Sequence, residues 1–106
     1  ENHCKALEYN EKALAIREKI LPPDHLDLSI SYNNMGYTWG KLGDFHKQLT
    51  FCQQALAIWE HALPFGHPNR VKILRRIAQA YGELGDREKE AEYNRLADLE
   101  EHGPQP

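Results

Sequence analysis

Hydrophobic residues recur every three or four positions along most of this chain, which is the spacing of one face of an α-helix. The clearest series is Leu28, Tyr32, Met35, Gly36, Trp39 and Leu42. The same spacing recurs over residues 45–59 and 74–84. Val, Ile and Thr are sparse and never alternate with polar residues, so the pattern predicts helices and no strands.

Turn-forming residues divide this pattern into five predicted helices. Pro22-Pro23-Asp24 and the segment 64–68 are strong helix breakers. Gly43-Asp44 and Gly85-Asp86 each place a glycine where one helix would end and an aspartate that can cap the next. The expected helices are residues 4–20, 26–42, 44–62, 68–84 and 86–101.

The chain repeats itself at a fixed offset. "ALAIRE" begins at residue 13 and "ALAIWE" at residue 55, an offset of 42 residues, and Leu42-Gly43-Asp44 maps onto Leu84-Gly85-Asp86 at the same offset. A constant period of this length is typical of stacked repeats. We therefore expect one domain over residues 1–102, with about two and a half repeats. Residues 1–21 would be the second helix of a partial repeat, 26–63 a full repeat, 68–102 a full terminal repeat and 103–106 a tail.

One set of positions carries a family resemblance: Met35-Gly36, Trp39, Gly43-Asp44-Phe45 and Ala55-Leu56. It resembles the tetratricopeptide repeat, and its long period is similar to the variety found in kinesin light chains and nephrocystin-like proteins. The resemblance implies an all-α, right-handed solenoid of antiparallel helix hairpins that binds proteins and is not an enzyme. The chain departs from the family where a small residue is preferred early in the second helix, because Gln48 and Glu90 stand there. Arg87 also replaces the turn aromatic seen at Phe45.

The resemblance also implies where a partner would bind. In this family the first helix of each hairpin lines a concave groove. The positions carried over as peptide-binding residues are Asn33, Asn34, Tyr37, Lys41, Lys72, Arg75, Arg76 and Gln79. Asn34, Arg76 and Lys72 are similar to part of the carboxylate clamp of co-chaperone tetratricopeptide domains.

The charge distribution supports an acidic partner independently of the resemblance. Residues 67–76 hold Arg70, Lys72, Arg75 and Arg76 and no acid, although the whole chain carries a net charge of −3. Arginine pairs carboxylates through two parallel hydrogen bonds, and asparagine both donates and accepts. We therefore expect a module that binds an extended acidic peptide, with Lys72, Arg75 and Arg76 not sequestered by the acids of the last helix. The other interpretation of this run is a solvated basic helix face, paired with acids of the last helix.

Two further expectations concern assembly and packing. A structural solenoid segment or self-association unit is the alternative function, with a homodimer through the open edge formed by helix 4–20.

Trp39 and Tyr81 share a repeat position and are expected in the core. Trp59 has two open interpretations, covering a neighbouring repeat or contacting a partner, because Arg17 and Glu101 occupy its repeat position.

Catalytic and metal-binding patterns are absent from the sequence. The six histidines form no HxxxH or HExxH pair, and no glycine-rich phosphate loop or nucleophile elbow occurs. We expect no enzyme, no cofactor and no metal, with His25 and His67 serving as structural residues at helix starts. The short basic run and negative net charge do not favour nucleic acid. Apolar runs of a few residues do not favour a membrane span.

The two cysteines bear on the compartment. Cys4 and Cys52 lie in helix-like stretches without CxxC spacing, so we expect both to be reduced, buried, apolar residues of a cytoplasmic protein. The chain opens on Glu1 and not on Met, and we expect it to be part of a longer protein.

Overall fold

The computed structural model describes residues 3–103, and the fold within this range is all-α. Five helices follow one another without a strand in the described chain: α1 (His3–Ile20), α2 (Leu26–Lys41), α3 (Phe45–Ala62), α4 (Pro68–Glu83) and α5 (Arg87–His102). The expected bounds are confirmed to within one residue at each end. Four of the differences fall on capping residues that flank the helices, namely Leu42, Asp44, Leu84 and Asp86, and the other two add His3 to α1 and His102 to α5.

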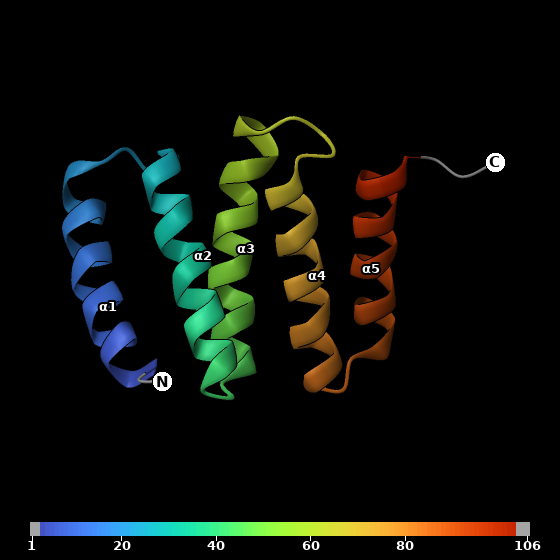
Figure 1. Cartoon of the computed structure of the whole chain (residues 1–106), viewed down its shortest axis with the longest axis horizontal. Coiled ribbons are helices and arrows are strands. Elements are labelled where there is room, and N and C mark those ends of the chain that lie inside the picture. The colour runs from blue at the N-terminus through green and yellow to red at the C-terminus, as the bar shows by residue number, and fades with distance from the viewer. Residues whose placement is uncertain (1–2, 104–106) are drawn as a thin grey trace.

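The helices form a single row in which each packs against the next one along the chain (Figure 1). Neighbours run antiparallel, and α1 and α5 lie at opposite ends of the row (Figure 1). The chain measures 46 × 29 × 21 Å along its principal axes, so it is elongated along the row. This is the architecture of a short helical solenoid, in which neighbouring repeats supply each other's core.

The turns within the two hairpins have the same construction. Gly43 and Gly85 adopt φ values of +86° and +89°, which only glycine takes up without strain. Asp44 and Asp86 follow, and each accepts a hydrogen bond on Oδ1 from the amide three residues on, at 3.1 and 3.0 Å. The left-handed conformation at Gly43 and the capping role of the aspartates confirm the turns expected from the sequence.

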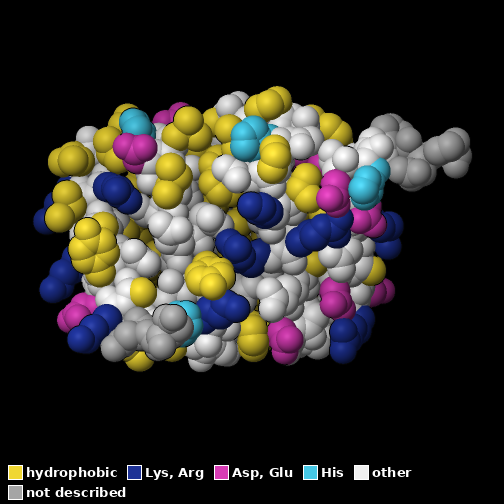
Figure 2. Space-filling view, in the orientation of Figure 1, with side chains coloured by type: hydrophobic (Ala, Val, Ile, Leu, Met, Phe, Trp, Pro, Cys, Tyr) yellow, Lys and Arg dark blue, Asp and Glu magenta, His cyan; other side chains and the backbone are white. Residues whose placement is uncertain are grey.

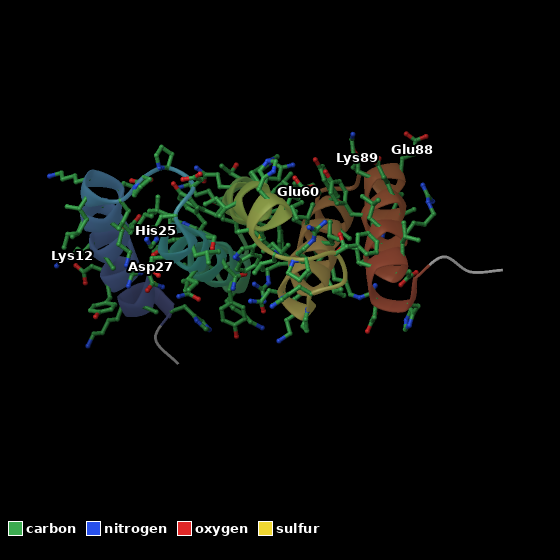
Figure 3. All side chains as sticks on the ribbon, turned by 90° about the horizontal axis from the view of Figure 1, so that it is seen from above. Lys12, His25, Asp27, Glu60, Glu88 and Lys89 are labelled. Atoms are coloured by element: carbon green, nitrogen blue, oxygen red, sulfur yellow. The ribbon has the colours of Figure 1, made fainter. Side chains whose placement is uncertain are left out.

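The linkers between hairpins end on histidine caps. Nδ1 of His25 accepts a hydrogen bond from the Asp27 amide, and Nδ1 of His67 accepts one from the Asn69 amide, both at 3.0 Å. Figure 3 labels His25 and Asp27 at the start of α2. The two rings satisfy amides that have no partner inside the helix, so the structural role expected for both histidines is confirmed.

The core runs the length of the row between the helices. Its most deeply buried large apolar side chains come from α2 and α4, and they are Leu28, Met35, Ile73 and Ile77. Trp59 is only 4% exposed and belongs to this core, so it is not an exposed residue that could contact a partner. Cys52 is buried as expected, whereas the expectation of a buried Cys4 is wrong, because that residue is exposed on α1.

Candidate functional site

α2 and α4 bring several of the predicted binding residues onto one face of the molecule. The Arg76 guanidinium on α4 donates a hydrogen bond to Oδ1 of Asn33 on α2. Its Cζ also lies 5.3 Å from the centroid of the Tyr37 ring, and Nζ of Lys41 lies at the same distance from that ring. Two cations from different hairpins therefore meet at one aromatic side chain. Figure 2 shows Lys and Arg side chains, in dark blue, gathered near the middle of this face.

A hollow of about 190 Å³ opens at this point between the two hairpins. Its lining residues are Tyr37, Gly40, Lys41, Gln48, Arg76 and Gln79. Four of the eight predicted binding residues thus line one hollow, and Asn33 borders it through its bond to Arg76. The lining combines two cationic groups, one aromatic ring and two amides, a combination suited to polar and negatively charged groups.

The side chain of Gln48 on α3 was missed as a site residue. It is 1% exposed, and its Nε2 donates to the Arg76 carbonyl oxygen at 3.0 Å. Its Oε1 is buried and has no hydrogen-bond partner in the described chain. Gly40 makes room for this side chain, since a Cβ there would come within 2.9 Å of Cδ of Gln48.

The sequence did contain a signal for this arrangement. Gly40 and Gln48 recur 42 residues later as Gly82 and Glu90, and a Cβ at Gly82 would lie 2.5 Å from Oε2 of Glu90. In both hairpins a long polar side chain replaces the small residue of the family, and a glycine faces it. The departure from the family pattern was visible, but its pairing with the glycine was not recognised.

Asn34 and Lys72 are exposed and lie outside the first hollow. Lys72 lines a second hollow, of about 220 Å³, together with Gly66, Pro68, Val71 and Glu101. Both residues are accessible, Asn34 on α2 and Lys72 on α4.

Arg75 departs from the expectation that the α4 cations escape the acids of the last helix. Its Nη2 donates to Asp98 Oδ1 at 2.8 Å and to Glu101 Oε1 at 2.6 Å, both on α5. The hydrogen bond to Asp98 is the largest cause of a raised pKa of this guanidinium, and the hydrogen bond to Glu101 is the second. The expectation is wrong for Arg75 because α5 packs beside α4 and brings these carboxylates within reach.

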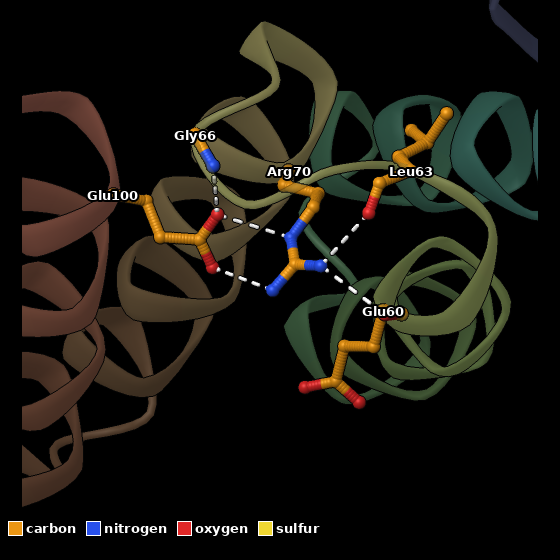
Figure 4. A network of polar contacts seen from close by, with 5 residues as sticks. All are labelled: Glu60, Leu63, Gly66, Arg70 and Glu100. Carbon is orange, nitrogen blue, oxygen red and sulfur yellow. Dashed lines mark hydrogen bonds and ion pairs between the residues drawn. The ribbon is translucent and has the colours of Figure 1, made fainter.

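Arg70 is also unavailable to a partner, because it is the centre of a buried network (Figure 4). Its Nε and Nη2 donate to the two carboxylate oxygens of Glu100 at 3.0 and 2.9 Å. Its Nη1 donates to the backbone carbonyls of Glu60 and Leu63, at 3.2 and 3.0 Å. Oε1 of Glu100 accepts a further bond from the Gly66 amide at 2.9 Å, so the pair ties the linker between α3 and α4 to α5.

Two further searches concern metals and membranes. Within residues 3–103, no group of three or more His, Cys, Asp or Glu side chains is arranged to hold a metal ion. None of the described helices is long and apolar enough to cross a bilayer.

The fold and this surface define an all-α repeat protein made of stacked helix hairpins. The comparison with protein families names the class: a tetratricopeptide repeat model matches residues 5–27 and 29–69, more than half of the chain. The chain belongs to the tetratricopeptide repeat family, whose repeats mediate protein–protein interactions and are not enzymes. A search of curated proteins found no match. Helices α4 and α5 lie almost wholly beyond the matched residues, yet their turn and caps repeat those of α2 and α3.

Proposed function

We propose that this chain binds an extended, acidic peptide segment of a protein partner on the face formed by α2 and α4. One observation carries the proposal. Lys41 and Arg76 come from different hairpins, contact the same Tyr37 ring and line the same hollow. A peptide lying across this hollow would meet positive charge from both repeats at once.

The hydrogen-bonding capacity of the three α4 arginines singles out Arg76. Arg70 and Arg75 are committed to carboxylates of α5. Arg76 has five N–H donors, and its hydrogen bond within the described residues goes to a neutral amide, Asn33. Donors therefore remain for a carboxylate of the partner. A charge-assisted hydrogen bond contributes about 1.5–3 kcal/mol at best, and ordering a flexible peptide offsets much of it. Micromolar affinity is the expectation.

The proposed contact residues follow from which arginine donors remain free to bind a partner. It keeps Tyr37, Lys41, Arg76 and Gln79 at the hollow, with Asn33 holding the Arg76 guanidinium in place. Asn34 and Lys72 would contact the flanking peptide, because they are exposed on the same two helices. Arg75 is left out, because a peptide would have to displace two carboxylates to reach it.

The test is the binding of a fluorescent acidic peptide by the wild type and by charge-reversed variants. Lys41→Glu is expected to weaken binding at least tenfold, Arg76→Glu to abolish it, and raising the salt concentration to weaken it further. Lys12→Glu makes the same change in net charge on α1, where Figure 3 labels the residue, and should leave affinity unchanged because Lys12 does not line the hollow. Equal binding by wild type and Arg76→Glu would contradict the proposal.

Self-association is the second candidate function, and the outer side of α1 favours it. Tyr9, Ile16 and Ile20 are 74%, 61% and 72% exposed there, although Leu14 on the same helix is buried against the core. Three large apolar side chains on one terminal helix form the kind of surface that a second copy of the chain would cover. The concentration dependence of the molecular mass tests this alternative.

A further inference from the structure

The side of α2 that contributes to the Tyr37 hollow carries an exposed apolar stripe. Its residues are Leu26, Ile30 and Tyr37, which are 44%, 49% and 45% exposed. They follow one another at intervals of four and seven residues, so they lie on one side of the helix. Lys41, four residues further on, continues that side and lines the hollow beside Tyr37. A purely acidic peptide would use the cations and leave Leu26 and Ile30 without a matching group.

α4 presents cations at the positions beside this stripe. Lys72 and Arg76 are one turn apart on α4, and Arg76 reaches α2 through Asn33 and the Tyr37 ring. Ile30 and Lys72 occupy the same repeat position, 42 residues apart, on helices that run in the same direction. In Figure 2 hydrophobic side chains, in yellow, lie over α2, and Lys and Arg side chains, in dark blue, lie on the α4 side of them. A ligand between the two helices would therefore meet apolar groups on one side and positive charge on the other.

The spacing of these residues matches an extended peptide. Residues four apart in an α-helix are about 6 Å apart along the axis. Alternate residues of an extended chain are about 6.6 Å apart and point to the same side. Lys72 and Arg76 on α4, and Leu26 and Ile30 on α2, are each four residues apart. Each pair can thus face two alternate residues of the same peptide.

We propose that the partner peptide alternates apolar and acidic residues, a specificity that rests on the proposed function. Its apolar side chains would cover the stripe on α2, and its carboxylates would pair with Lys72 and Arg76 on α4. Successive side chains of an extended chain point to opposite sides, so alternation is the order that satisfies both helices at once. A peptide with neighbouring acids would place carboxylates against the stripe and leave its apolar surface in contact with water.

The test uses three fluorescent peptides with equal numbers of leucine and glutamate in different orders. One alternates the two residues, one groups them in two blocks, and one repeats leucine every three or four positions, as an amphipathic helix would. All three have the same charge and composition, so electrostatic attraction alone cannot separate them. We expect the wild type to bind the alternating peptide at least about fivefold more tightly than either of the others.

Two matched variants locate the source of this preference. Ile30→Ser removes the middle of the stripe, so the preference should fall below about twofold. Leu96→Ser removes a side chain of similar exposure, 40%, from α5 and should keep the preference. An equal effect of the two substitutions would overturn the role of the stripe.

The outcomes separate this inference from the proposed function. If the wild type binds all three peptides equally and Arg76→Glu weakens all three, acidic-peptide binding stands and the alternation is overturned. If the helical order binds best, the alternation is overturned together with the extended conformation of the ligand. If no peptide binds, the inference and the proposed function are both overturned.

Methyl nuclear magnetic resonance of the wild type gives a reading that needs no variant. The alternating peptide should shift the methyl signals of Ile30 much more than the block peptide does at equal occupancy. Equal shifts would also overturn the alternation.

Discussion

The buried ion pair between Arg70 and Glu100 predicts a large, non-additive loss of stability when either partner is removed. The two side chains are only 13% and 8% exposed, and two parallel hydrogen bonds join them. Removing one partner of a buried pair typically costs about 3–5 kcal/mol, because the other charge stays buried without compensation. Exposed pairs are worth about 0–1 kcal/mol, so burial decides the magnitude here.

The contacts place each substitution within that range. Glu100→Gln keeps the shape and can still accept from Nε of Arg70, so we expect a loss of about 3 kcal/mol. Arg70→Met also removes the donors to the carbonyls of Glu60 and Leu63, and we expect about 4 kcal/mol. The double substitution leaves no unpaired buried charge, so its loss should fall short of the sum by at least about 2 kcal/mol.

Urea denaturation followed by far-ultraviolet circular dichroism measures the full double-mutant cycle. A loss of 3 kcal/mol should lower the melting temperature by about 10–20 °C in a domain of this size. Arg87→Met breaks the exposed Arg87–Glu90 pair, in which the arginine is 78% exposed, and should cost less than about 1 kcal/mol. Additive single substitutions, or single losses below about 1 kcal/mol, would refute the reasoning.

Three further predictions follow from the turns, the thiols and the terminal helix. Gly43→Val should destabilise the fold by about 1–2 kcal/mol in thermal denaturation, because φ is +86° there and no neighbour lies close enough to compensate; an unchanged melting temperature would contradict this. Burial raises the pKa of Cys52 to about 12, so an alkylating reagent at pH 8 should modify the exposed Cys4 and spare Cys52 until the protein is denatured; equal native rates would be inconsistent with that. The chain should either dimerise through α1, with Ile16→Glu and Ile20→Glu giving monomers in sedimentation, or exchange its α1 amides faster than those of α4; a monomer with equal protection in both helices would rule out both behaviours.

The helices and their turns were predictable because their determinants are local. Gly43 and Asp44 set one turn through the backbone conformation of the first and the capping bond of the second. Both effects act within a few residues, so the sequence alone contains them. The repeat then supplied a second copy of the same signals at Gly85 and Asp86.

The roles of the arginines were not predictable, because distant residues decide them. Arg70, Arg75 and Arg76 stand in one run without an acid and look equivalent in the sequence. Arg70 pairs with a carboxylate 30 residues later, and Arg75 with two that lie 23 and 26 residues later. Arg76 bonds an amide 43 residues earlier. Each partner lies on another helix, so only the packing of α4 against its neighbours separates the structural arginines from the one with donors to spare.

The burial of Cys4 was mispredicted for a related reason. A residue in a helix-like stretch is buried only if another helix covers its side, and within the described chain α1 has a neighbour on one side only. The repeat pattern assigns Cys4 a helical environment but does not say whether that face is covered. Burial in a solenoid therefore depends on the neighbours that are present, and the terminal helix is where sequence arguments from the repeat fail first.

Both hairpins carry a glycine opposite a long polar side chain, but the surroundings of the two polar side chains differ. This difference explains why the proposed site lies between the hairpins and has no counterpart beside α5 within the described residues. Glu90, opposite Gly82, is 30% exposed at its side chain and bonds Arg87 at 2.9 Å, so its charge is paired and partly hydrated. Gln48, opposite Gly40, is covered by the next repeat and bonds the Arg76 backbone, which leaves Oε1 buried and unpaired. Within the described residues, the same repeat position thus yields a surface ion pair at α5 and a buried, unpaired acceptor at α3, against which α4 packs. Covering by the neighbouring hairpin turns a departure from the family pattern into a candidate site.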